Sequence, residues 1–503
     1  MRTRSGPRAL IAFAGVVAIL ATACGTASST PSATTAASQA AASAAATATP
    51  TPPPAVTAAP LPADQPGPNG GAVVRWFVGL GAGGQPQQFA AEQAFVQKFN
   101  DSPEAKDKVY ISLEIYNNNV AASLLATQIA AGNAPDIIGP VGVEGLNIFR
   151  DQLLDLAPLV AKSGFDTSKY DPALVDFFKL GEGGTTIGLP FAVYPSMLWY
   201  NTKLFKEAKL PLPPTKVGDL YEGKPWDMDA VRTLGMKLTV DKNGVDATDP
   251  KFDAANVVQW GFDMQYADNS PLAEASLFGA SSFVAADGKT AQIGDPVRVG
   301  EKWFNDGVWK DHFIPNANQI NSDLLAKGSE FASGNLAMNE THTWFTCCTA
   351  PAAPAKPIVT DFGWAVAPAY NGVTTAKLHA DTFSILKTTK HPDEAFAAVA
   401  AFVESSELLA TYGALPADPA LQQPFIDTIN KQFPGIKLDW DVPKAMLSHP
   451  DVPNHQAWVP DYAKSKKAWQ AFQNKYRTSA GVDIDAELDT LKTTLQGIYD
   501  AAQ

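Results

Sequence analysis

The chain is poor in the residues from which most catalytic and metal sites are built. Only 3 of its 503 residues are cysteine and only 6 are histidine, and the histidines show no metal-ligand spacing. The sequence also has no H-E-x-x-H, G-x-S-x-G, C-x-x-C or Walker pattern. We therefore expect no enzyme activity, no metal site and no cofactor.

Runs of positive charge are absent, and long apolar runs are absent beyond the N-terminal segment. The formal net charge is −13, from 38 Lys and Arg against 51 Asp and Glu. An acidic surface without a Lys/Arg run argues against nucleic acid and anionic lipid as partners. After the N-terminal segment, no apolar stretch approaches the roughly 20 residues of a membrane-spanning helix.

Residues 1–23 predict an export signal. Three arginines and no acid precede an apolar run at 10–23, which is shorter than a spanning helix needs. The residues before Cys24 resemble a bacterial lipoprotein box, in which the cysteine is lipidated and becomes the new N-terminus. Simple secretion, with cleavage after the Ala-Thr-Ala at 21–23, is the alternative.

Residues 24–70 predict a lipidated, disordered tether. The segment is almost entirely Ala, Ser, Thr, Pro and Gly after Cys24, with too little bulky apolar surface to offset the entropy of ordering. Removing 70 of the 503 residues leaves 433, which is too many for one core and enough for two lobes. We expect these lobes at the outer face of the cytoplasmic membrane, anchored through Cys24.

One strand-like stretch organises the rest of the chain. Residues 188–201 are largely apolar, and a short amphipathic helix follows them. Pro195 lacks an amide donor, so an unbroken central ladder cannot pass through it. A stretch that is sheet-like and yet interrupted indicates a crossing point between two lobes.

Several motifs, in order along the chain, resemble the extracellular solute-binding proteins of family 1, the maltose-binding-like group of ABC importers. They are the stretch at 188–208, the Ala-x-Gly-x-x-Pro-Asp turn at 130–136, the Phe-x-x-Gly-x-x-Ala-Met segment at 331–338 and the His-Pro helix start at 391. The resemblance implies an α/β fold of the type II periplasmic-binding-protein kind. Each lobe is then a mostly parallel sheet flanked by helices, and hinge strands join the two lobes. The expected first lobe is 71–190 plus 369–404, and the expected second lobe with its closing helices is 191–368 plus 405–503.

The same resemblance implies a function. Proteins of this group capture a carbohydrate between their lobes by hinge closure and deliver it to membrane permease subunits, without a cofactor; we expect a monomer. A non-sugar solute, such as a polyol or a sugar phosphate, is one alternative. An exported carbohydrate-active enzyme is another, because the fold decides whether paired acids approach each other.

The resemblance also indicates which aromatic side chains face the ligand. Trp344 and Trp458 stand where the family places stacking aromatics, and Tyr194 lies just past the expected hinge. Aromatic rings offer a flat apolar face to a sugar, although burial in the core is the commoner fate of any one of them.

The expected polar contacts come from loops and strand ends. Gly81 lies in a loop at 79–84 that formally matches G-x-G-x-x-G, but Gln85-Pro86 separates the glycines from the next helix, which favours a ligand loop over a dinucleotide site. Asn269 lies in a loop of the second lobe. For Asp136, Asp381 and Thr382, turn capping is the alternative to ligand contact.

Cys347 and Cys348 are adjacent. Their Cα atoms are about 3.8 Å apart, below the usual disulfide range of roughly 4.4–6.8 Å. An oxidising compartment favours a bond all the same. A vicinal disulfide and two free thiols both remain open.

Overall fold

The structure is a computed structural model that describes residues 61–62, 64–180, 184–265, 270–350 and 357–502. The chain divides into two units, Met1–Pro52 and Pro53–Gln503, and every described residue belongs to the second. The predicted export signal, Cys24 and Asn269 lie outside the described residues.

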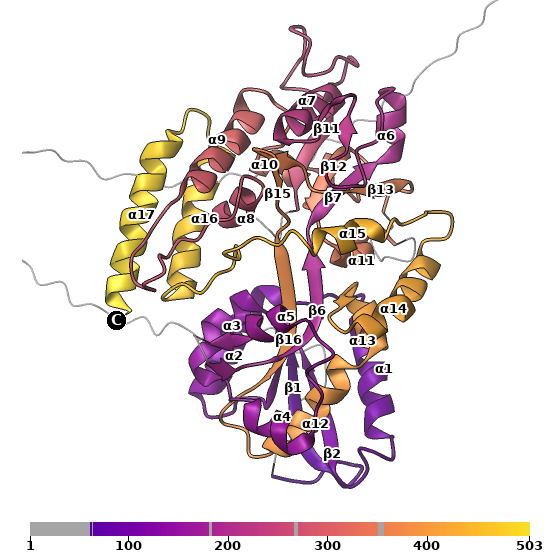
Figure 1. The fold of residues 1–503 in the computed structure, drawn as a ribbon, viewed down its shortest axis with the longest axis vertical. Coiled ribbons are helices and arrows are strands. Elements are labelled where there is room, and N and C mark those ends of the chain that lie inside the picture. The colour runs from indigo at the N-terminus through magenta and orange to yellow at the C-terminus, as the bar shows by residue number, and fades with distance from the viewer. Residues whose placement is uncertain (1–60, 63, 181–183, 266–269, 351–356, 503) are drawn as a thin grey trace, which may run out of the picture. The chain divides into compact units, whose positions relative to one another are not determined.

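The first sheet has six strands in the order β17-β6-β16-β3-β1-β2. Figure 1 labels four of them, β1, β2, β6 and β16, in the lower lobe. Strand β1 runs parallel to β2 and β3, whereas β16 runs antiparallel to β3 and β6. The aromatic and β-branched run of β1 suits this central position, and Trp76 and Phe77 are fully buried there. The strands are β1 (Ala72–Val78), β2 (Val109–Ile115), β3 (Ile137–Gly142), β6 (Leu189–Pro195), β16 (Leu378–Ile385) and β17 (Leu415–Pro416).

Helices from three stretches of the chain pack on this sheet and complete the first lobe. Helix α1 contacts β2 and α13, and α12 contacts β16, β2, β6 and β1. Asn117 caps the N-terminus of helix α2, because its side chain accepts a hydrogen bond from the amide of Asn119. The helices are α1 (Phe89–Asn100), α2 (Asn118–Ala130), α3 (Val143–Phe149), η1 (Arg150–Gln152), α4 (Ala157–Ser163), α5 (Pro172–Phe177), α12 (Pro392–Val403), α13 (Ser406–Tyr412) and α14 (Pro419–Gln432).

The second sheet has five strands in the order β10-β11-β12-β7-β13. Among its described pairings only the β11–β12 pair is parallel, and the other three are antiparallel. Its strands are β7 (Met197–Asn201), β10 (Val240–Asp241), β11 (Val257–Met264), β12 (Leu336–Thr341) and β13 (Phe362–Ala365).

The second lobe adds helices to this sheet. Helix α7 contacts β11, and α9 contacts α8, α16 and α17. The helices are α6 (Thr202–Glu207), α7 (Met228–Leu238), α8 (Pro271–Ser276), α9 (Asp295–Trp309), α10 (Ala317–Ile320), η3 (Asp323–Leu325), η4 (Thr343–Phe345), α11 (Thr346–Thr349), α15 (Asp441–Met446), α16 (Tyr462–Thr478) and α17 (Ile484–Ala501). Three small ladders pair β4 (Lys179–Leu180) with β5 (Thr185–Thr186), β8 (Leu220–Tyr221) with β9 (Lys224–Pro225), and β14 (Ala369–Tyr370) with β15 (Val373–Thr374).

Three chain segments meet where the lobes join. The first is the β6–β7 connection, in which Ser196 alone separates the strands; its amide donates to the carbonyl of Lys377 (2.8 Å), and the Lys377 amide donates to its hydroxyl (2.9 Å). The second segment, at 366–378, leads from β13 into β16. The third, at 447–458, pairs with the second through the amides of Ala376 and Asp451. These bonds satisfy the backbone at the interruption that Pro195 predicts.

The predicted mostly parallel sheets are wrong in detail, because both sheets are mixed. The strands next to the crossing, β6, β16, β7 and β13, run antiparallel to all their neighbours. The predicted lobe boundaries also differ from the strand pairings. Strand β6 stays in the first sheet through Pro195, past the boundary at 190, and β17 and α13 pack on the first lobe although they follow residue 404.

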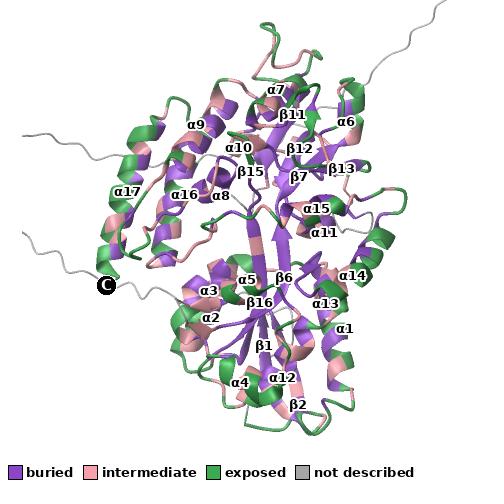
Figure 2. Cartoon of the chain, in the orientation of Figure 1, coloured by how far each residue is buried: buried purple, intermediate pink, exposed green. Residues whose placement is uncertain are grey.

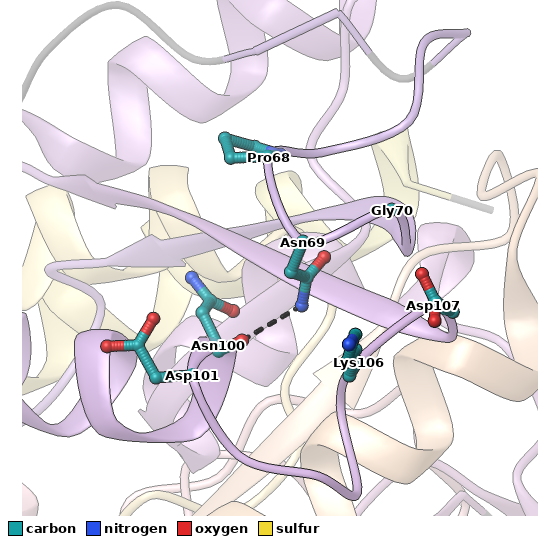
Figure 3. A pocket seen from close by; sticks show the side chains of 7 residues that line it. All are labelled: Pro68, Asn69, Gly70, Asn100, Asp101, Lys106 and Asp107. Carbon is teal, nitrogen blue, oxygen red and sulfur yellow. Dashed lines mark hydrogen bonds between the residues drawn. The ribbon is translucent and has the colours of Figure 1, made fainter.

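The predicted disorder does not extend to residue 70. The Asn69 side-chain amide donates to the carbonyls of Asn100 (3.0 Å) and Val109 (2.9 Å), and its oxygen accepts from the amide of Gly71 (2.9 Å). Figure 3 shows the first of these bonds. Gly67 is buried against Tyr110. One amide side chain therefore holds the end of this segment on the first lobe, where composition alone predicts a free coil.

Among the described helices, none is long and apolar enough to cross a membrane by itself. Taken together, α12 and α13 meet the length and composition criterion, with a bend of 66° between them.

Candidate functional site

Aromatic residues from both lobes converge at the crossing. Tyr194, at the end of β6 in the first lobe, lies 5.2 Å from Trp344 of η4 in the second, measured between ring centroids. Tyr194 is 1% exposed, and Trp344 is partly buried. Figure 2 shows that β6 and β16, which lie side by side here, are buried along almost their whole length. The structure thus brings together two residues that the sequence placed at the ligand, 150 positions apart.

Trp344 is held in one orientation. Its indole nitrogen donates to Oε1 of Gln265 (2.6 Å), and the ring of His342 stacks on it at 3.9 Å and 28°. The edge of His379 from β16 lies 4.9 Å away. These contacts fix the ring and cover one of its faces, so the part of the ring that stays exposed is available as a rigid platform.

Asp381 and Gly81 also lie together. The amide of Ala82 donates to Oδ2 of Asp381 at 3.4 Å, and the Gly81 carbonyl accepts from the side chain of Asn118 (2.6 Å). A Cβ at Gly81 would come within 2.8 Å of the Pro140 carbonyl, so the loop needs glycine there. Burial raises the pKa of Asp381 to about 6, against the opposing effects of the Ala82 amide and His379.

Behind Tyr194 lies a pair that the sequence analysis missed. Glu92 of α1 is fully buried, and burial raises its pKa to about 8. Burial, with the nearby carboxyl of Glu92, raises the pKa of Tyr412 well above its ordinary value. In the described part of the chain, the Tyr194 hydroxyl has no hydrogen-bond partner. The sequence pattern could have indicated that Glu92 is buried, because Glu92 lies at helical spacing from Phe89, Val96 and Phe99 and so on the apolar face of α1.

A group of histidines is the second feature that the sequence analysis missed. Nε2 of His455 lies 3.0 Å from Nε2 of His379, and Nδ1 of His455 lies 2.7 Å from Oδ2 of Asp451. The rings of His342 and His379 are 4.8 Å apart. These histidines come from β16, the end of β12 and the third crossing segment, so no local spacing could reveal them. We call Tyr194, His342, Trp344, His379, Asp381 and His455 the crossing cluster.

Two of the predicted contact residues lie elsewhere. Asp136 accepts hydrogen bonds from the amide of Arg75 (2.9 Å) and the hydroxyl of Thr389 (2.6 Å), at the opposite end of β3 from Gly142, the partner of Asp381. The Thr382 hydroxyl donates to the carbonyl of Leu189 (2.6 Å). The bonds of Asp136 match its structural alternative, whereas Thr382 lies inside β16 and its bond joins that strand to β6 and caps no turn.

Trp458 lies on the third crossing segment, three residues after His455. It is partly buried, and the guanidinium of Arg150 lies over its ring at 5.6 Å. The side chain of Asn147 donates to the Gln456 carbonyl (3.2 Å), which ties this segment to α3. Trp458 is therefore placed near the crossing by its neighbours in the chain.

Cys347 and Cys348 are free thiols in α11, so the structure has the unbonded alternative. Their sulfurs are 2.9 Å apart, and the side chain of Gln87, from the first lobe, lies 3.6 Å from the sulfur of Cys347. The hydrogen bond from Cys348 lowers the pKa of Cys347, and the same contact raises that of Cys348. The pair lies where the two lobes touch.

A surface hollow of about 410 Å³ lies away from the crossing (Figure 3). It is open to solvent and holds none of the predicted contact residues. The residues that line the hollow are Pro68, Asn69, Gly70, Asn100, Asp101, Lys106 and Asp107.

The described residues contain no group of three or more His, Cys, Asp and Glu side chains that could hold a metal ion.

Comparison with known proteins identifies the family. The sequence model of the bacterial extracellular solute-binding proteins matches residues 82–407. The chain belongs to this family. Its members are extracellular solute-binding proteins, which agrees with the predicted solute-binding role and with the predicted location outside the cytoplasm.

Solved structures show the same two-lobed fold at low sequence identity. The ABC substrate-binding protein Lmo0181 from Listeria monocytogenes, in complex with cycloalternan, is 18% identical, with a TM-score of 0.65 over 85% of this chain and 98% of that one. UspC of M. tuberculosis is 22% identical, with a TM-score of 0.59 over 86% and 100%. The maltotriose-bound MalE domain from Bdellovibrio bacteriovorus is 16% identical, with a TM-score of 0.60 over 85% and 99%. No curated protein sequence matches this solute-binding protein.

Proposed function

We propose that this solute-binding protein captures a carbohydrate between its lobes and delivers it to the permease subunits of an ABC importer. The observation that carries the proposal is the approach of Tyr194 and Trp344, two aromatic side chains from different lobes whose ring centroids are 5.2 Å apart. Asp381 and the Gly81 loop lie beside them on the first lobe.

This combination suits the chemistry of a sugar. A pyranose has apolar C–H faces and a rim of hydroxyl groups, so an aromatic ring packs on the face while carboxylate and phenol oxygens bond the rim. The Trp344 ring supplies the platform, and Asp381 supplies an acceptor. The ligands named for the similar structures, cycloalternan and maltotriose among them, support a carbohydrate.

Hinge closure would couple capture to delivery. A ligand that contacts groups of both lobes binds the closed form more tightly, and it shifts the population toward that form. The hinge lies where Ser196 and Lys377 share two hydrogen bonds, one between their backbones and one from the Lys377 amide to the Ser196 hydroxyl. Beside it, Lys377 and Glu340 form an ion pair of 2.6 Å with no solvent exposure, which ties the second crossing segment to β12.

The rest of the proposal concerns where the protein works. A lipid on Cys24 would hold it at the outer face of the cytoplasmic membrane, and residues 24–60 would serve as the tether. The protein would bind its carbohydrate as a monomer. The closed form would then dock on the permease, which uses ATP on the other side of the membrane.

Thermal melting of the purified protein against monosaccharides, oligosaccharides, polyols, sugar phosphates and amino acids tests the proposal. A ligand at 100 times its Kd adds about 2.7 kcal/mol, enough to raise the melting temperature by a few degrees. We expect a shift with one carbohydrate class, lost in Trp344→Ala and kept in Trp309→Phe, because Trp309 is equally half-buried but bonds the Tyr476 carbonyl inside the second lobe. A shift with amino acids alone, or with no compound, would refute it.

A further inference from the structure

Gln265 stands at the carboxyl end of the one parallel strand pair described in the second sheet. It directly follows β11, and its amide donates to the carbonyl of Glu340 in β12 (3.1 Å), so the ladder continues beyond the strand. Thr341 ends β12, and Trp344 follows shortly after. Open α/β sheets place their ligands at the carboxyl ends of parallel strands. The side chain of Gln265 therefore belongs to the edge of the sheet where a ligand is expected.

The carboxamide of Gln265 can point in only one direction. An indole N–H donates and cannot accept, so the Gln265 atom that lies 2.6 Å from the indole nitrogen of Trp344 is the oxygen. The hydroxyl of Thr341 donates to the same oxygen. A carboxamide oxygen has two lone pairs, and side chains of this lobe occupy both. The amide nitrogen, Nε2, is thereby fixed on the other side of the group.

This amide nitrogen is an ordered donor that the protein itself does not use. Nε2 carries two N–H groups. In the part of the chain that the structure describes, neither of them makes a hydrogen bond, whereas Oε1 of the same side chain makes two. The side chain is partly buried. Gln265 thus offers a donor, held in one orientation, to an acceptor that comes from outside the protein.

A sugar packed on Trp344 would bring acceptors to this donor. The hydrogen bond from the indole nitrogen lies close to the plane of the ring, so Gln265 sits at the edge of the aromatic platform and leaves its face clear. The hydroxyl groups of a stacked sugar point outward past the edge of the ring, and each has lone pairs that can accept. Asp381, from the first lobe, offers only acceptors when ionised, so the two lobes present complementary polar groups.

We propose that Gln265 binds the carbohydrate directly: its Oε1 fixes Trp344, and its Nε2 donates a hydrogen bond to a hydroxyl at the rim of the sugar stacked on that ring. This inference rests on the proposed function and adds a polar contact from the second lobe. A sugar that meets Gln265 on one lobe and Asp381 on the other gains both bonds only when the lobes are closed. The contact also makes the site selective for a hydroxyl at one position of the sugar.

Gln265→Glu tests the contact without removing the platform. A carboxylate accepts from Trp344 and Thr341 as the amide oxygen does, and these two bonds favour its ionised form. Only the free donor is replaced, by an acceptor, so the melting temperature without ligand should match that of the wild type. Gln292→Glu is the matched control, because it adds the same charge to an exposed position of the second lobe, where Gln292 bonds the Val284 carbonyl.

Calorimetric titration at pH 7.5 with maltotriose, or with α-D-tagatose if only a monosaccharide binds, and with monodeoxyfluoro derivatives of that sugar measures the contact. Fluorine accepts weakly from an N–H and donates nothing, so it is disfavoured opposite a carboxylate. At one position of the sugar we expect fluorine to cost Gln265→Glu about tenfold more affinity than it costs the wild type. At the other positions, and throughout in Gln292→Glu, the costs should equal those of the wild type.

Gln265→Met is a second variant, which holds the test open if the glutamate disturbs the fold. Its side chain has no donor for the sugar, so fluorine at the same position should cost it less affinity than it costs the wild type. Equal costs at every position in all variants, with a wild type that binds the parent sugar, would overturn the contact and leave the proposed function standing. A wild type that binds neither sugar nor any other carbohydrate would overturn both.

Discussion

Two clusters of buried polar groups among the described residues are built differently. In the second lobe, Arg477 of α16 bonds Glu274 of α8 at 2.9 Å and lies 3.6 Å from Asp263 of β11. The hydroxyl of Tyr476 donates to the same glutamate at 2.7 Å. All these groups belong to one lobe, whereas the crossing cluster takes its members from both.

The comparison shows that a raised pKa does not by itself mark a binding site. Burial raises the pKa of Asp263 to about 7 and that of Glu330 to about 8 in the second lobe, and it raises that of Asp381 to about 6 at the crossing. The physical cause is the same in each case. What differs is the setting: the groups around Arg477 all belong to one lobe, whereas the crossing cluster takes its members from both lobes.

Removing the cation of the Arg477 cluster in the second lobe should have the largest effect on stability. Arg477→Met leaves Glu274 and Asp263 as buried carboxylates without their cation, so we expect the free energy of unfolding to fall by about 3–5 kcal/mol. Urea unfolding measures it. Lys302→Met removes the partner of Asp485, an exposed pair, and should leave the unfolding curve unchanged. If the two variants changed the free energy of unfolding equally, the buried ion pairs of Arg477 would not be what stabilises the second lobe.

A change in the crossing cluster should instead lower the affinity for carbohydrate. Trp344→Ala removes the aromatic platform, and we expect carbohydrate affinity to fall roughly 10- to 100-fold, about 1.4–2.7 kcal/mol. Calorimetric titration gives the affinity, and the melting temperature without ligand shows whether the fold is intact. Unchanged affinity would exclude Trp344 from the site.

Two aspartates sharpen the comparison further. Asp136→Ala removes the acceptor for the Arg75 amide and the Thr389 hydroxyl, so stability should fall by about 1–3 kcal/mol with little change in affinity. Asp381→Asn should weaken carbohydrate binding about tenfold without lowering stability at pH 7.5, because it removes a buried charge. If Asp136→Ala instead weakened carbohydrate binding and Asp381→Asn instead lowered stability, Asp136 would belong to the binding site and Asp381 would have a structural role.

The raised carboxyl pKa values predict how stability depends on pH. With its pKa near 8, buried Glu330 keeps a proton that the unfolded chain releases above the ordinary value of 4.5. Its contribution to the free energy of unfolding is therefore complete below pH 4.5 and is lost as the pH rises toward 8. Glu330→Gln should flatten this slope, and Glu207→Gln, on the exposed side of α6, should not. A slope unaffected by Glu330→Gln would show that this carboxyl is ionised in the folded state.

The smallest effect is expected at the start of the first lobe. Asn69→Ala removes the hydrogen bonds to Asn100 and Val109, so amides of 61–71 should exchange faster and proteases should cut there. Melting temperature and carbohydrate affinity should change little. Protection that persists in the variant would mean that other contacts hold the segment.

The elements with strong local signals could be predicted from the sequence. The β-branched and aromatic residues at 73–78 predict a strand, which is β1 (Ala72–Val78), and the helix-stop signal Gly132-Asn133 lies just after α2 (Asn118–Ala130). The crossing at Pro195 is also where the sheets change. In each case the information lies within a few residues: a β-branched run, a helix stop at Gly-Asn, a proline in an apolar strand.

Features that depend on contacts between distant residues could not be predicted. Strand direction at the crossing depends on how the chain returns from the second lobe, so the mixed sheets were missed. His379 and His455 are 76 positions apart, and only the fold makes them partners. Asp136, which the family motif highlights, bonds Thr389 from another part of the chain, and that bond settles its side-chain direction.

The most direct test of the account is a calorimetric titration of the wild type and of Trp344→Ala, at pH 7.5, with the carbohydrate that gives the largest melting shift. The account predicts one site per chain with saturable binding in the wild type and an affinity 10- to 100-fold lower in the variant, whose melting temperature without ligand is unchanged. Binding of equal strength in both proteins would contradict it, because the sugar would then bind away from the crossing cluster.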